Sequence, residues 1–159
     1  MSGNMPLEQI LKRDSERGDR REIKIKTNDN TIKLFDRHLD PCEQECGDQY
    51  KKICVNDVTF KLGKRDGCFM TTDQKIVVLE NLVQRDRNTV VFIGKRFHNY
   101  ENVYTYPINS SSLGIFMVSG QSVIREAFPL ETVFAKCWLL EDGDSSVSIP
   151  LVHSTPLLH

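Results

Sequence analysis

Aromatic, polar and charged side chains gather between Gly94 and Pro107, and this stretch is the strongest candidate for ligand recognition. Its members are Phe97, His98, Tyr100, Glu101, Tyr104 and Tyr106. Aromatic rings closed by a carboxylate form the kind of pocket that receives a methylated lysine through cation–π attraction. The alternative is that some of these rings fill the core, because aromatic side chains are large apolar groups. We predict a ligand-binding loop, the aromatic segment (residues 97–106).

A nucleic-acid surface is the alternative use of the same region, because rings stack on bases while cations meet phosphates. Its candidate residues are Lys95, Arg96, Arg20, Arg21, Lys24 and Lys26. The last four belong to a segment, residues 12–26, in which basic and acidic residues alternate. A formal net charge of −1 gives the whole chain no electrostatic drive toward nucleic acid. We therefore expect a protein or peptide ligand, with nucleic acid as the alternative.

Four side chains have the donor atoms of a structural zinc site and follow one another at short spacing: His38, Cys42, Cys46 and Cys54. Pro41 interrupts the helix that would align the first three on one face. No Cys-x-x-Cys pair is present. We expect no metal and no cofactor, and this set remains the alternative.

A hydrolase nucleophile could come from the run Ser110 to Ser112, beside His98 or His153. A strained Gly-x-Ser-x-Gly turn is missing, and a run of serines before a strand is normally a turn. Cys68 and Cys137 lie in apolar strand patterns, where thiols are usually packed and inert. We therefore expect a protein that is not an enzyme.

Strand patterns, separated by turn residues about every ten positions, must position these side chains. Residues 90–93 form an apolar run that ends at Gly94, and residues 113–118 repeat that pattern after the aromatic segment. Residues 22–35 alternate around a turn-prone Asn-Asp-Asn, which predicts a hairpin. Further strands are expected at 53–62, bent near Asn56 and Asp57, and at 75–83, 132–140 and 147–152. A short helix is expected at 6–13.

These elements predict a mainly β fold, a small twisted antiparallel barrel with an N-terminal arm or hairpin. Length and composition, 159 residues with 39% hydrophobic and 27% charged, suit one domain. We expect a charged arm at 1–49, the barrel at 50–154 and a tail at 155–159. The start of the chain has no secretory pattern and no apolar run is long enough to cross a bilayer, and five cysteines suit reduced thiols, so we expect an intracellular protein.

Several motifs along the chain resemble a known module. They are the series from YKKICVNDVTFKLGKRDGCFMTTDQKIVVLENLV through VVFIGKRF and YTYPINSSSLGIFMVS to FPLETVFAKCWLL and IPLVHS. This series, from about Tyr50 to Ser154, resembles the C-terminal region of large animal proteins encoded by En/Spm-like (CACTA) transposons. The order of strands, with residues 94–107 and Lys136-Cys137, is also similar to a bromo-adjacent-homology (BAH) domain.

The resemblance implies a BAH-like β module that follows a transposase core, in a terminal fragment or domesticated descendant of such an element. Strand transfer itself needs three carboxylates on an α/β scaffold, and the chain lacks the alternating helices of that scaffold. The implied function is a non-enzymatic interaction module at chromatin, which binds a protein or histone peptide through the aromatic segment. The implied location is the nucleus, with the cytoplasm as the alternative.

Overall fold

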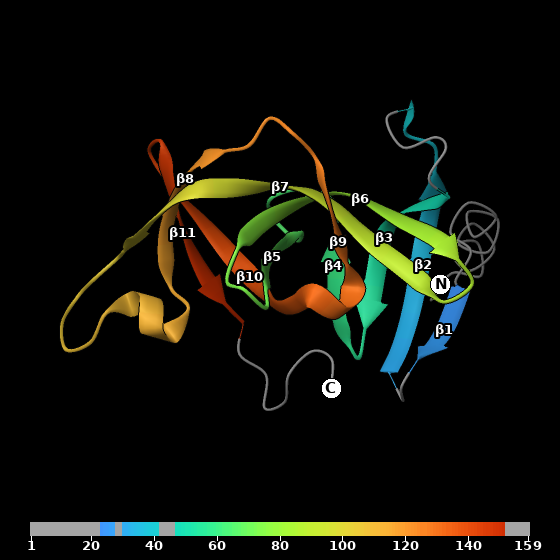
Figure 1. Ribbon diagram of the computed structural model, residues 1–159, viewed down its shortest axis with the longest axis horizontal. Helices are drawn as coiled ribbons and strands as arrows, with labels where there is room; N and C mark the ends of the chain where they lie inside the picture. Colours follow the sequence, from blue (N-terminus) through green and yellow to red (C-terminus); the bar gives the residue numbers. More distant parts are fainter. Residues whose placement is uncertain (1–22, 28–29, 42–46, 152–159) are drawn as a thin grey trace, which may run out of the picture.

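The computed structural model describes residues 23–27, 30–41 and 47–151, which form one antiparallel sheet of eleven strands (Figure 1). The expected helix at 6–13, Arg20 and Arg21, Cys42 and Cys46, and His153 lie outside these residues. The strands in chain order are β1 (Ile23–Thr27), β2 (Asn30–His38), β3 (Asp48–Val55), β4 (Val58–Lys61), β5 (Cys68–Thr71), β6 (Ile76–Asp86), β7 (Thr89–Asn102), β8 (Phe116–Gln121), β9 (Glu126–Pro129), β10 (Val133–Asp142) and β11 (Ser145–Pro150). Two short 3-10 helices, η2 (Ser110–Leu113) and η3 (Leu130–Thr132), precede β8 and β10. The expected mainly β fold is confirmed.

Six strands close into a ring because each pairs with two neighbours, in the order β6, β5, β10, β11, β8, β7 and back to β6. The long strands β6 and β7 leave this ring and continue together across the molecule (Figure 1). Beyond the ring, β6 pairs with β3 and β7 pairs with β9. The barrel predicted from the strand pattern is therefore present, and it shares two strands with a second part of the sheet.

The hairpin expected at 22–35 is confirmed as β1 and β2, in which Ile25 pairs with Ile32. Strand β2 then pairs with β3 along most of its length, and Ile32 and Leu34 are buried in the core. The domain boundary expected at Tyr50 falls inside β3. The β1–β2 hairpin consequently belongs to the same sheet as the ring.

Residues 53–62 do not form the single bent strand expected from their pattern. The chain reverses at Asn56 and Asp57, whose φ angles are 47° and 72°. Two successive residues at positive φ make the tight hairpin turn that matches strand twist, and Asn and Asp tolerate this conformation. Strand β4 therefore runs back antiparallel along β3, with Val55 opposite Val58.

Strand β5 is buried on both faces, so its successive side chains enter two different cores. Phe69 packs into the larger core with edge-to-face contacts to Phe92 at 5.2 Å and Phe128 at 5.7 Å between ring centroids. Cys68 and Met70 point the other way, into the interior of the ring. The ring interior is completed by residues of β6, β7, β8 and β10: Ile76, Val78, Phe97, Phe116, Val118 and Cys137.

No helix in the described part of the chain is long and apolar enough to span a membrane.

Candidate functional site

Strand β7 runs through Gly94 and continues to Asn102, so the strand end expected at Gly94 is wrong. A Cβ atom at Gly94 would lie 2.6 Å from the Val78 carbonyl oxygen and 2.6 Å from Val77 Cγ1. Glycine is needed here because the backbone of β6 approaches closely, which is one of the ordinary reasons for a glycine inside a strand. Residues 97–102 of the aromatic segment consequently belong to a strand of the ring.

The aromatic segment is divided between the barrel interior and solvent. Phe97 is buried in the ring, and Tyr100 packs edge-to-face on Phe116 with ring centroids 5.4 Å apart. His98 and Glu101, also on β7, are exposed. Phe97 and Tyr100 are thus core residues, and they do not line an open aromatic pocket with the exposed side chains.

Tyr104 and Tyr106 lie in the loop between β7 and η2, and both are exposed, Tyr106 to 87%. Val103, Ile108 and Leu113 are further large apolar side chains that this part of the chain leaves exposed. In Figure 1 the loop projects from the end of the barrel, away from β1, β2 and β3. Residues 103–113, here called the projecting loop, are therefore the exposed part of the predicted binding site.

The projecting loop is held in one conformation by Ser110, whose side chain is fully buried. Its Oγ accepts a hydrogen bond from the Val103 N–H at 2.8 Å and donates one to the Ile115 carbonyl at 2.9 Å. Its backbone N–H donates to the Tyr104 carbonyl at 2.8 Å. A fully bonded buried hydroxyl fixes the two ends of the loop against each other.

Asn102 and Gly114 fasten the same loop at its two ends. The Asn102 side-chain oxygen accepts a hydrogen bond from the Ser111 N–H at 2.9 Å. Gly114 adopts a φ of 77°, and a Cβ there would lie 3.1 Å from Pro150 Cγ, so the loop returns to the barrel against β11. The serines at 110–112, which sequence patterns indicate as a turn, form this η2 anchor.

The basic residues proposed for nucleic acid are engaged in ion pairs on the side of the barrel. Lys95 Nζ lies 3.7 Å from Glu80 Oε1, and Arg96 Nε lies 3.0 Å from Glu126 Oε2. The side chains of Lys24 and Lys26, on β1, are outside the described part. Lys95 and Arg96 therefore face carboxylates of their own chain, which reduces the positive charge that they offer to a phosphate.

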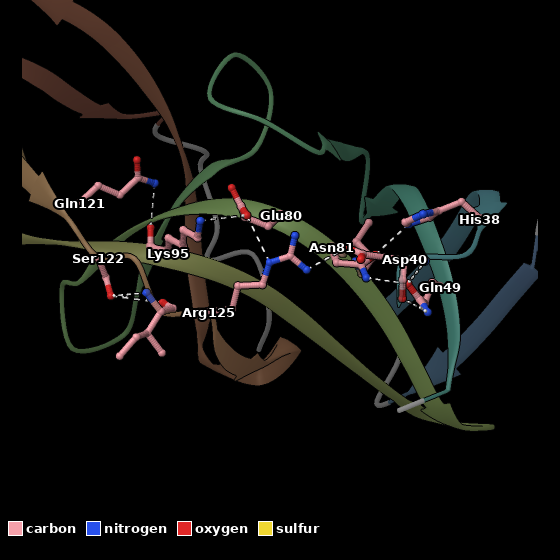
Figure 2. A network of polar contacts seen from close by, with 11 residues as sticks. His38, Asp40, Gln49, Glu80, Asn81, Lys95, Gln121, Ser122 and Arg125 are labelled. Carbon is pink, nitrogen blue, oxygen red and sulfur yellow. Dashed lines mark hydrogen bonds and ion pairs between the residues drawn. The ribbon is translucent and has the colours of Figure 1, made fainter. Parts of the chain in front are cut away.

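A polar network that sequence patterns did not reveal crosses the sheet near Lys95 (Figure 2). Arg125 bridges the carboxylates of Asp40, at 2.8 Å, and Glu80, at 3.2 Å. The buried amides of Asn81 and Gln49 continue it, since Asn81 Nδ2 donates to Gln49 Oε1 at 2.8 Å. Its members lie far apart in the sequence, on β3, β6 and the β8–β9 connection, so no local motif could identify them.

His38 ends this network rather than a metal site, because its Nε2 lies 2.8 Å from Asn81 Oδ1. His38 is opposite Gln49, and Cys54 lies farther along β3, about 16 Å away at about 3.3 Å per residue. Two ligands of one zinc ion have to lie within about 4 Å of each other. His38 and Cys54 therefore cannot share a zinc, and among the residues that the structure describes no group of His, Cys, Asp and Glu is arranged to hold a metal.

Comparison with known proteins gives one match, to the family described as "Domain of unknown function (DUF8592)", over residues 27–151. No curated protein and no solved structure matches the chain. The matched region begins in β1 and includes every later strand of the sheet. Because this match covers most of the sequence, the chain belongs to the DUF8592 family.

Proposed function

We propose that this chain is a non-enzymatic interaction module, which binds a protein or peptide through the projecting loop. The observation that carries the proposal is the exposure of Tyr104, Tyr106, Ile108 and Leu113 on a loop whose backbone is anchored by the buried Ser110. Exposed apolar side chains gathered on one element are typical of interaction sites. An anchored loop also loses little conformational entropy on binding, so more of the contact energy appears as affinity.

The chemistry of the loop favours a peptide that carries a cation beside an apolar residue. Tyrosine offers a ring face for cation–π contact and a hydroxyl for hydrogen bonding. Glu101 and His98 are exposed on β7, just before the loop. In this proposal the cation–π contact is made by Tyr104 and Tyr106, because Phe97 and Tyr100 are packed inside the barrel.

The resemblance to CACTA-transposon and BAH modules supports a histone peptide as the ligand and the nucleus as the location. We therefore propose a transposon-derived chromatin-binding module. Nucleic acid, the alternative partner, gains no support from Lys95 and Arg96, which pair with carboxylates.

The test is a binding titration of the full chain against unmodified and methylated histone peptides, beside single-stranded and duplex DNA at two salt concentrations. The double variant Tyr104→Ala with Tyr106→Ala should weaken peptide binding at least roughly tenfold, since an aromatic anchor is commonly worth more than about 1 kcal/mol. Trp138→Ala is the matched control, because Trp138 is also exposed but lies on β10. It should leave the affinity unchanged.

Two outcomes would contradict the proposal. Peptide binding that survives the double variant but is lost with Trp138→Ala would move the site to β10. DNA binding that falls steeply with salt, without any peptide binding, would show that several phosphates are contacted and would favour the nucleic-acid alternative.

A further inference from the structure

The interior of the ring holds two cysteines on neighbouring strands. Strands β5 and β10 pair with Met70 opposite Ala135 and Phe69 opposite Lys136. Continuing this register by one residue on each strand brings Cys68 opposite Cys137. Both thiols are free, both are buried, and both belong to the same core cluster inside the ring.

Residues that face each other on antiparallel strands have Cα atoms about 4.5–5.5 Å apart. A disulfide needs Cα atoms about 4.4–6.8 Å apart and side chains that point the same way. Cys68 and Cys137 meet both conditions, because their side chains enter the same core. A bond between their sulfur atoms therefore requires no movement of either strand.

The surroundings of the two thiols are polar on one side. Ser148, on β11, is fully buried, and its hydroxyl lies close enough to lower the pKa of both thiols, although it makes no hydrogen bond of normal geometry. A hydrogen bond between the thiols raises the pKa of Cys68, to which burial adds, and lowers the pKa of Cys137. The thiolate is the attacking form, and the hydrogen bond between the thiols makes one of the pair easier to ionise than an isolated buried thiol.

A surface cavity lies next to this pair along β10. Its volume is about 210 Å³, and it is lined by Lys64, Arg65, Trp138, Leu139 and Glu141. Leu139 also packs against the ring core, two residues beyond Cys137 on the same face of the strand. The side chain of Leu139 thus stands between the cavity and the thiol pair. Arg65 gives the cavity a positive group, whereas Lys64 Nζ lies 3.8 Å from Glu141 Oε1 and is partly neutralised.

We propose that Cys68 and Cys137 form a reversible disulfide, with glutathione disulfide, an anionic oxidant, entering at this cavity. The Cys137 thiolate attacks one sulfur of glutathione disulfide, the S–S bond breaks, and one glutathione thiolate leaves with the proton that Cys137 gave up. The Cys68 thiolate then attacks the Cys137 sulfur of the mixed disulfide and releases the second glutathione, which takes the Cys68 proton. Two protein thiols are oxidised and one glutathione disulfide is reduced to two glutathiones.

The bond joins two ring strands that are distant in sequence, so it restricts the unfolded chain strongly. The oxidised protein should melt about 10 °C higher than the reduced protein, as expected for a long closed loop in a domain of this size. The disulfide is therefore a means by which the redox state sets the stability of the barrel.

The test is to equilibrate the full chain with mixtures of reduced and oxidised glutathione and to map disulfides by mass spectrometry of proteolytic peptides. The expected product lacks two hydrogen atoms and has Cys68 linked to Cys137. Cys54→Ser, which alters a half-buried thiol on β3, should leave this product unchanged. Leu139→Ala should speed its formation several-fold by opening the path from the cavity, and Arg65→Glu should slow it.

The unmodified protein alone can contradict the proposal, so the test does not depend on variants that fold poorly. If Cys68 and Cys137 stay reduced at equilibrium while the protein remains folded, the proposal is wrong. It is also wrong if the mapped bond joins other cysteines, or if a glutathione adduct at Cys137 persists without closing onto Cys68.

Discussion

The hydroxyl oxygen of Tyr100 accepts a hydrogen bond of 2.7 Å from the backbone N–H of Ile76. The bond joins the end of β7 to the first residue of β6, inside the part of the ring where Tyr100 packs on Phe116. An aromatic residue that sequence patterns assign to ligand binding thus closes one end of the barrel.

Tyr100→Phe should lower the free energy of unfolding by about 1–2 kcal/mol, because it leaves the Ile76 N–H without its acceptor. Urea denaturation measures this change. Tyr106→Phe is the control, since Tyr106 is almost fully exposed. Equal stability of the two variants would show that the Ile76 bond contributes nothing.

The same residue should make the barrel sensitive to alkali. Burial raises the pKa of Tyr100 above its ordinary value of 10.0 in the folded state. A raised folded-state pKa gives stability that is fully present below the unfolded value and is lost as the pH rises through the folded value. Stability should therefore fall above about pH 10. Thermal melts across this range should show a shallower decline in Tyr100→Phe, and parallel curves for the two proteins would contradict the assignment.

Two buried serines should respond in opposite directions to the loss of their hydroxyl groups. Ser110→Ala removes both bonds of Oγ, from Val103 N–H and to the Ile115 carbonyl, and should cost about 1–3 kcal/mol of stability. Ser148→Ala removes a buried hydroxyl that makes no bond of normal geometry, and should be neutral or stabilising by up to about 1 kcal/mol. Chemical denaturation of both variants is the measurement. The reverse order of stability would refute this description of the two sites.

Gly94→Ala should destabilise the β6–β7 pairing, because the added Cβ would meet the Val78 carbonyl oxygen. Overpacking of this kind typically costs about 1–3 kcal/mol. The melting temperature of Gly94→Ala should consequently fall, and amide exchange should accelerate first in the paired residues around Leu79. A melting temperature equal to that of the unmodified protein would show that β6 can move aside freely.

Regular alternation and turn chemistry made much of the fold predictable. The β1–β2 hairpin, the long apolar strands and the barrel class follow from local patterns. A glycine within a strand pattern marks either the end of the strand or a close approach of a neighbouring backbone, and only the neighbouring strand decides which of these applies at Gly94. Asn56 and Asp57 are compatible with both a bend and a full hairpin turn, and the pairing of β4 with β3 decides between them. The pairing of β6 with both β3 and β5 depends on contacts between residues distant in sequence, which local patterns do not indicate.

The sequence predicted the exposure of only some members of the aromatic segment, for a related reason. Tyr104 and Tyr106 are exposed. Phe97 and Tyr100 instead pack against the ring core, because β7 continues past Gly94 to Asn102. The Arg125 network and the opposed thiols of Cys68 and Cys137 arise from strand pairing. Neither could be identified before the register of the sheet was known.

The most direct test of the central claim is a chemical-shift map of the isotopically labelled full chain titrated with methylated and unmodified histone peptides. If the peptide binds through the projecting loop, the largest amide shifts will cluster at residues 101–113, with smaller shifts at the ends of β7 and β8. Shifts confined to β10 around Trp138, or no shifts with any peptide at millimolar concentration, would contradict it.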